Sequence, residues 1–158
     1  MELRVGIGVD AHALETGVPL VLGGVAIDYP RGLAGHSDGD VIAHALIDAI
    51  LGAANLGDIG SLFPSSDEQY RGASSLDLLW EAYREARGAG WELVNADCVL
   101  VGEEPRIAGV RDEMGERLAG VLGVETGCVT VRATTTDGLG YTGRGEGLAA
   151  HAVALLRR

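Results

Sequence analysis

Aspartate and histidine residues gather in two short segments in the first third of the chain. The first segment is Asp10-Ala11-His12, and the second runs from His36 to His44. Carboxylate and imidazole groups together suit a transition metal such as zinc. On a strand, Asp10 and His12 project from one face because they are two residues apart, while His44 lies where a helix should begin. Three such ligands leave a fourth metal position free, as a catalytic zinc site requires.

One further carboxylate is placed to orient this site. Asp48 follows His44 by four residues, so both lie on the same face of the expected helix. We expect Asp48 to accept the ring N–H that His44 does not use for the metal, as outer carboxylates do in many zinc sites. Each residue taken alone also fits a polar strand end or a capped helix start, so the metal hypothesis depends on the joint pattern.

A second group of polar residues follows an expected strand near residue 134. Thr134, Thr135 and Thr136 offer hydroxyls and loop amides that suit phosphate oxygens. Asp137 could hold a hard cation such as Mg²⁺ against those phosphates. The same run is also typical of a turn that closes a strand. The glycine-rich segment 140–147 does not have the order of a dinucleotide-binding fingerprint, so it predicts no nucleotide site by itself.

Composition limits what the chain can bind and where it can work. With 158 residues, of which 47% are hydrophobic, it is expected to form one domain over 1–158. A net charge of −11 disfavours nucleic acid and anionic membranes, and it makes a bound cation necessary for any phosphorylated substrate. Cys98 and Cys128 lack metal-site spacing and are expected to be free thiols. With no signal-like N-terminus, we expect a cytoplasmic protein.

The hydrophobic pattern predicts alternating strands and helices around these residues. The expected strands cover 3–9, 18–28, 91–101 and 129–133. The expected helices cover 40–56, 74–88, 105–121 and 146–156, with a long loop at 57–72. This order predicts an α/β sandwich in which helices pack on one face of a mostly four-stranded mixed sheet. The uncovered face of such a sheet would favour self-association.

Five motifs in order carry a resemblance to a known family. They are GVDAH at 8–12, LAGHSDGD at 33–40, LGDIG at 56–60, RATTT at 132–136 and GRGEG at 143–147. Together they span nearly the whole chain, which resembles the 2-C-methyl-D-erythritol 2,4-cyclodiphosphate synthases of non-mevalonate isoprenoid biosynthesis. The resemblance implies a homotrimer with active sites between adjacent subunits.

The resemblance also implies a reaction and its cofactors. The substrate would be 4-diphosphocytidyl-2-C-methyl-D-erythritol 2-phosphate, whose 2-phosphate attacks the β-phosphorus and releases CMP. This is the reaction of a phosphorus–oxygen lyase. Zinc would be held by Asp10, His12 and His44, and Mg²⁺ or Mn²⁺ by Asp137.

Individual roles follow residue by residue from the same resemblance. His36 and Thr135 match the pair that stabilises the transition state. The matching substrate-binding positions are Ser37, Asp58, Ile59, Gly60, Phe63, Ser65, Asp67, Gly102, Arg106, Ala108, Ala133, Thr134 and Thr136. Among these, the loop 102–108 and the threonine run match the cytidine and phosphate pocket. Tyr141 and Arg144 match residues near the threefold axis, where the family has a cavity for isoprenoid-like phosphates.

The chain departs from the family pattern at four positions. Ala11 replaces a valine, Asp137 replaces a glutamate, Arg106 replaces a lysine and Ser65 replaces an aspartate. Two rival functions stay open beside the synthase. One is a zinc-dependent phosphoesterase that uses water as nucleophile. The other is a non-catalytic trimeric binding protein whose metal is structural, which would require a further ligand such as His151.

Overall fold

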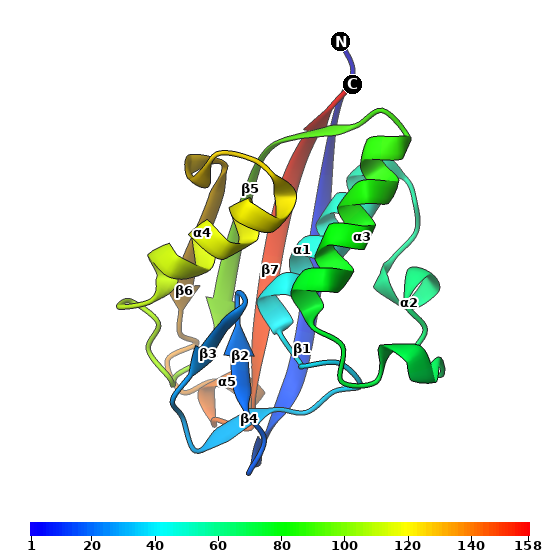
Figure 1. Ribbon diagram of the computed structural model, residues 1–158. Coiled ribbons are helices and arrows are strands. Elements are labelled where there is room, and N and C mark those ends of the chain that lie inside the picture. The colour runs from blue at the N-terminus through cyan, green and yellow to red at the C-terminus, as the bar shows by residue number, and fades with distance from the viewer.

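The computed structural model describes all 158 residues and places three long helices against one face of a five-stranded sheet (Figure 1). The strand order is β4-β1-β7-β5-β6, and only β5 and β6 run parallel. The strands are β1 (Leu3–Thr16), β4 (Arg31–Leu33), β5 (Glu92–Val101), β6 (Val129–Thr134) and β7 (Gly147–Arg157). The helices are α1 (Val41–Ala54), α3 (Ser75–Gly88) and α4 (Arg111–Leu122). The mixed α/β fold with helices on one face is therefore confirmed, although only three of the four predicted strands belong to the sheet, which β4 and β7 complete.

The segment predicted as one strand at 18–28 is a separate two-stranded hairpin. It consists of β2 (Leu20–Leu22) and β3 (Val25–Ile27), which turn at Gly23 and Gly24. Both glycines have positive φ angles of 56° and 76°, which favour residues without a side chain. The short strand β4 was not predicted. Shorter helical turns complete the chain, namely α2 (Ile59–Leu62), η1 (Glu68–Tyr70), η2 (Thr126–Cys128) and α5 (Gly140–Gly143).

A buried carboxylate ties this hairpin to the first helix. Asp40 caps α1 by accepting the Ala43 N–H at 3.1 Å. It also accepts the N–H groups of Gly23 at 2.9 Å and Gly24 at 2.8 Å. Burial raises the pKa of Asp40 to about 6, although three N–H donors oppose that rise. The start of α1 is thus fixed in place, and His44 lies in its first turn.

The C-terminal segment is a strand, so the helix predicted at 146–156 is wrong. Alanine favours helices, and this segment is rich in alanine. Its burial nevertheless alternates: Ala150, Ala152 and Ala154 are buried, while His151 and Val153 are exposed. This period of two is that of a strand, and β7 pairs with β1 along eleven residues. The helix predicted from 105 likewise begins only at Arg111, as α4.

Small residues bring α1 close to the sheet. A Cβ atom added to Gly8 would lie 1.8 Å from the Ala45 carbonyl oxygen, and one added to Gly6 would lie 2.0 Å from that of Ala49. No side chain fits into such distances, so the glycines permit the helix backbone to rest on β1. The same face of β1 continues beyond the start of α1, where Asp10 and His12 replace the glycines.

The opposite face of the sheet carries exposed apolar side chains. Val5, Ile7 and Val9 of β1 are between 54% and 69% exposed, and Val153 of β7 is 43% exposed. They alternate with the buried residues of the same strands, so Val5, Ile7 and Val9 form a row along β1 with Val153 beside it. This row lies on the sheet face opposite the long helices, whose position Figure 1 shows. Such a row is typical of an interaction surface. No helix in the protein is both long and apolar enough to cross a bilayer.

Candidate active site

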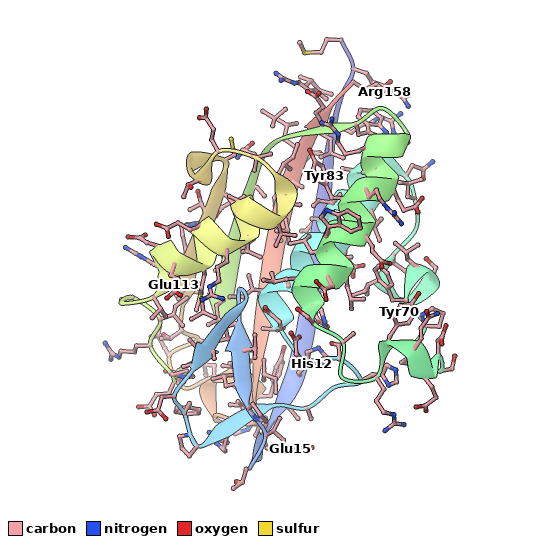
Figure 2. The ribbon with its side chains drawn as sticks, viewed as in Figure 1. His12, Glu15, Tyr70, Tyr83, Glu113 and Arg158 are labelled. Carbon is pink, nitrogen blue, oxygen red and sulfur yellow. The ribbon has the colours of Figure 1, made fainter.

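Three potential metal ligands meet where β1 passes the start of α1. Asp10 and His12 project from the helix-covered face of β1, and His44 projects toward them from α1. Their ligand atoms all lie within 4.8 Å of one another, as the sequence predicted. Figure 2 shows His12 below the first turn of α1, at the lower end of the helical layer.

The spacing of these three atoms fits a single ion. Oδ2 of Asp10 lies 2.8 Å from Nε2 of His12 and 3.0 Å from Nδ1 of His44. The two ring nitrogens are 3.3 Å apart, with the rings at 72° to each other. Ligand atoms about 2.0–2.1 Å from a tetrahedral zinc are roughly 3.3 Å from one another. One carboxylate and two imidazoles at these distances therefore suit a divalent transition metal, with room for a further ligand.

The electrostatics of the three groups also favour a cation. Burial raises the pKa of Asp10, but hydrogen bonds from His12 and His44 together outweigh it and lower the pKa to about 2. The hydrogen bond to Asp10 raises the pKa of His12 against the opposing effect of its own burial. Asp10 is thus ionised throughout the physiological range and attracts positive charge to this point.

The expected contact between Asp48 and His44 is absent, so that part of the prediction is wrong. The Asp48 carboxylate accepts the N–H of Ile59 at 2.7 Å and holds the start of α2. The second ring nitrogen of His44, Nε2, instead lies 2.8 Å from the Ser75 hydroxyl and 3.0 Å from that of Ser37. Ser75 opens α3 and was not singled out in the sequence, because a serine at a helix start is usually only a cap.

The three ligands border a cavity of about 230 Å³, which we call the metal pocket. Its other walls come from residues 36–37, from the segment that precedes α3 and from the first turn of α3 itself. These lining residues are His36, Ser37, Ile59, Gly60, Phe63, Ser65, Tyr70 and Leu78. His36 donates from Nε2 to the Asp67 carbonyl at 2.9 Å, which fixes its ring in the wall. Six predicted substrate-binding or catalytic residues are thereby brought together with the ligands, whereas Tyr70 and Leu78 were not predicted.

Two predicted substrate-binding carboxylates do not line the metal pocket. Asp58 caps α2 by accepting the Ser61 N–H at 2.8 Å, within a complete capping box. Asp67 caps η1, and its side chain accepts from the N–H and the side-chain amide of Gln69. Both residues therefore shape the loop around the pocket. Tyr70 adds to this loop by packing its ring edge-on against Phe63, with 5.3 Å between the ring centres.

A second cavity of about 270 Å³ lies between the 102–108 loop and the end of β6, and we call it the loop pocket. It includes most of the residues predicted for the cytidine and phosphates, namely Gly102, Arg106, Ala108, Ala133, Thr134 and Thr135. Thr136 does not line it, because its hydroxyl donates to the Leu139 carbonyl at 2.7 Å. Glu103 lies in the predicted 102–108 loop but was not named as a site residue. It accepts the N–H groups of Thr136 and Gly138 and so holds the loop together.

The remaining predicted residues lie on exposed turns. Asp137 is exposed, has a positive φ angle of 53° and accepts from the Thr135 hydroxyl at 3.2 Å. Tyr141 is 45% exposed, and Arg144 pairs with Glu146 at 2.9 Å. None of the three lines the metal pocket or the loop pocket. The two pockets also share no residue, so the site residues of one chain fall into two separate groups.

Comparison with known proteins gives the chain its family. Residues 3–157 match the YgbB family. The chain belongs to the YgbB family. Within it, the 2-C-methyl-D-erythritol 2,4-cyclodiphosphate synthase of Moorella thermoacetica is 56% identical over 154 residues, which cover 98% of this chain and 94% of that protein.

Solved structures agree with this membership. A 2C-methyl-D-erythritol-2,4-cyclodiphosphate synthase in its bound form with CDP has a TM-score of 0.89 and 38% identity, covering 98% of this chain and 100% of its own. The bifunctional IspDF protein of Campylobacter jejuni has a TM-score of 0.95 and 42% identity. The alignment covers 98% of this chain and 42% of the bifunctional one.

Proposed function

We propose that this YgbB-family chain converts 4-diphosphocytidyl-2-C-methyl-D-erythritol 2-phosphate into 2-C-methyl-D-erythritol 2,4-cyclodiphosphate and CMP. In this reaction the 2-phosphate forms a new bond to the β-phosphorus, and the bond between that phosphorus and the CMP oxygen breaks. The enzyme would be a phosphorus–oxygen lyase. The observation that carries the proposal is the triad Asp10, His12 and His44 at the wall of a pocket, in a chain 56% identical to a named synthase.

The reaction joins two anionic groups, so charge and alignment determine its rate. A divalent ion held by Asp10, His12 and His44, which we propose to be zinc, would offset phosphate charge and help to align the reacting groups. His36 is fixed at the wall of the same pocket by its bond to the Asp67 carbonyl. We assign it the role of stabilising the charge that develops on the phosphates, together with Thr135.

The loop pocket would hold the other end of the substrate. Arg106 brings a guanidinium to its edge, and Thr134 and Thr135 bring hydroxyls, which suit phosphate oxygens. Asp137, next to these hydroxyls, would hold Mg²⁺ or Mn²⁺ against the diphosphate. A solved relative in its bound form with CDP supports a cytidine nucleotide as the occupant.

We infer that a complete site needs two copies of the chain. His36 and Thr135, the proposed stabilising pair, line different pockets of one protomer. Each pocket, at about 230 and 270 Å³, is also smaller than the roughly 300–1,000 Å³ of typical ligand sites. A homotrimer would pair the metal pocket of one copy with the loop pocket of its neighbour. The exposed apolar row of β1 supports such assembly, with Tyr141 and Arg144 assigned to the threefold axis.

The position of His151 disfavours the binding-protein alternative. A closed structural metal site would need a further ligand, and His151 was the remaining histidine. It lies on β7 opposite Val9, exposed on the open face of the sheet, whereas Asp10 and His12 project from the helix-covered face. His151 therefore does not reach the triad, and the fourth position of a bound metal would stay open to a substrate oxygen.

The two thiols are consistent with a cytoplasmic location. Cys98 and Cys128 are both free. Burial raises the pKa of the Cys98 thiol to about 12, so it stays protonated and unreactive. Free thiols of this kind persist in reducing compartments.

The products of one turnover distinguish the proposed functions. Purified protein would be incubated with the substrate, zinc and Mg²⁺, and the phosphorus-containing products followed by ³¹P NMR. We expect the cyclic diphosphate and CMP in equal amounts, with none formed after treatment with a chelator. A linear hydrolysis product would instead indicate a phosphoesterase, and tight binding without turnover would indicate a binding protein.

A further inference from the structure

A chain of hydrogen bonds leads from the second ring nitrogen of His44 to a carboxylate that does not line the metal pocket. Nε2 of His44 lies 2.8 Å from the hydroxyl of Ser75. That hydroxyl donates to Oδ1 of Asp38, and the backbone N–H of Ser75 donates to Oδ2 of the same carboxylate at 3.0 Å. Ser75 is fully buried, so bulk water does not compete for these bonds.

The direction of this chain follows from the groups that form it. The Asp38 carboxylate accepts backbone N–H groups on both of its oxygens, so it acts as an acceptor and the hydroxyl hydrogen of Ser75 points to it. Only lone pairs of the Ser75 oxygen then remain toward His44, and Nε2 must be the donor. With a proton held on Nε2, the nitrogen that can give up its hydrogen to take a cation is Nδ1, which lies 3.0 Å from Oδ2 of Asp10.

The neighbouring hydroxyl of Ser37 does not impose this direction. It lies 3.0 Å from the same Nε2 and 3.4 Å from the Ser75 oxygen, and its only other partner is the N–H of Gly39. No carboxylate takes its hydrogen, so it can either donate or accept. Asp38 is different because it is held on both oxygens: Oδ1 also accepts the N–H of Asp40 at 3.1 Å.

We propose that Ser75 and Asp38 are positioning residues that keep a proton on Nε2 of His44 and thereby present Nδ1 to the catalytic cation. This inference rests on the proposed function for the identity of that cation. Ser75 and Asp38 thus orient the His44 ring, the role that the sequence suggested for Asp48. The Asp48 carboxylate instead accepts the N–H of Ile59. It also links the start of α3 to the metal pocket, because Ser75 is the first residue of that helix.

Asp38 also stabilises the start of α3, and the tests must separate this structural role from its effect on His44. Ser74 stands at the capping position of α3 but makes no side-chain capping bond. Asp38 takes that place by accepting the N–H of Ser75. The substitution Ser75→Ala removes only the hydroxyl and leaves this backbone bond. It therefore interrupts the chain to His44 without removing the cap.

The protonated nitrogen of His44 can be observed directly. In wild-type protein labelled with ¹⁵N-histidine, we expect a slowly exchanging Nε2–H of His44, both without metal and after zinc is added. If Nε2 carries no proton in either state, the inference is wrong, even if zinc binds. If the Nε2–H is present but zinc does not bind, the positioning chain stands and the proposed function fails.

Zinc affinity measured by chelator competition provides the second test. For Ser75→Ala we expect zinc affinity to fall by about 10- to 100-fold, as for other outer partners of metal-binding histidines, with turnover restored at saturating zinc. Ser74→Ala removes an exposed hydroxyl from the adjacent residue and should leave zinc affinity unchanged, and Ser37→Ala should lower it less than Ser75→Ala does. A folded Ser75→Ala protein with wild-type zinc affinity would overturn the inference. If Ser75→Ala does not fold, the ¹⁵N measurement of the Nε2 proton in the wild type decides whether the inference holds.

Discussion

The metal pocket and the loop pocket of this protein are built in opposite ways. Asp10, His12 and His44 project from the long strand β1 and from the buried first turn of α1, and they contact one another at 2.8–3.3 Å. In the loop pocket, Arg106 and Thr135 are exposed on connecting segments. The first group is positioned by the fold before any ligand arrives, whereas the second is positioned mainly by its own loops.

This difference indicates that the two pockets have different tasks. Groups that must align reacting atoms benefit from a rigid support, since small displacements lower the rate strongly. Groups that recognise a nucleotide can adjust when the ligand binds, and they would tolerate an open surface until the proposed neighbouring subunit covers it. The predictions below test whether the two pockets respond separately to substitution, starting with the largest expected effect.

Replacing a proposed metal ligand should abolish the function of the metal pocket and leave the loop pocket intact. We expect His44→Ala to lose bound zinc and to lower turnover by roughly 10³-fold or more, because the ion contributes several kcal/mol to the reaction. The protein should remain folded, keep its oligomeric state and bind CDP normally. Metal analysis, a turnover assay and CDP titration measure the three properties. Turnover that persists without bound zinc would contradict the assignment.

Separating α1 from β1 should damage the same pocket from a distance. In Gly8→Ala the new methyl group would lie 1.8 Å from the Ala45 carbonyl oxygen, so α1 must move away and carry His44 with it. We expect about 1–3 kcal/mol less unfolding free energy and a zinc affinity lower by roughly 10²-fold. Chemical denaturation and chelator competition measure these changes.

A matched glycine gives the control for this effect. A methyl group added to Gly52 of α1 would have only one close neighbour, the Ile7 carbonyl oxygen at 4.0 Å. Gly52→Ala should therefore fit and should stabilise the helix by up to about 1 kcal/mol. Equal destabilisation by both substitutions would show that the close approach at Gly8 is not what holds the pocket.

The loop pocket should respond to the loss of its arginine without any change at the metal. We expect Arg106→Ala to weaken CDP binding by about tenfold, the effect of one exposed charged hydrogen bond to phosphate, and to leave zinc affinity unchanged. Isothermal titration with CDP and with zinc measures both. Arg84→Ala, which removes an exposed arginine from α3, should change neither. A weaker zinc site in Arg106→Ala would argue against independent pockets.

The smallest effect is expected at Asp137. Its carboxylate is exposed, so Asp137→Ala should raise the Mg²⁺ concentration for half-maximal turnover by only a few-fold, as expected for an exposed ligand that shares the ion with phosphates and water. Asp137→Glu restores the longer side chain that is usual in the family and should lower that concentration. An unchanged Mg²⁺ dependence in both variants would exclude Asp137 from the second cation site.

The sequence predicted that Asp10, His12 and His44 meet because the evidence for that was local. Strand alternation places Asp10 and His12 on one face, and the helix start places His44 nearby. The helix spacing also suggested Asp48, but spacing within one helix does not tell which other segment a side chain reaches. In the structure the start of α2 approaches Asp48, and the start of α3 brings Ser75 to His44. These contacts depend on how distant segments of the chain pack together. The residue spacing within one helix carries no information about that packing.

The C-terminal segment shows the same limit for the fold. Alanine propensity favoured a helix over 146–156, but the small side chains of Ala150, Ala152 and Ala154 serve to let α1 lie close on β7. In the sequence, alanine alternates with larger residues over 150–154, which is a strand pattern. The helix propensity of alanine outweighed that pattern in the prediction. The order of the five strands, and the division of the site residues between two pockets, could be learned only from the structure.

Mixing two inactive variants tests most directly whether a complete site joins the metal pocket of one copy to the loop pocket of another. His44→Ala disables the first pocket and Thr135→Ala the second, so each homotrimer should be nearly inactive. After the two are mixed, dissociated and reassembled in equal amounts, we expect about one quarter of wild-type activity, because random assembly leaves both halves of a shared site intact at that frequency. Mixed trimers, verified by native mass spectrometry, that show no recovered activity would contradict the shared site.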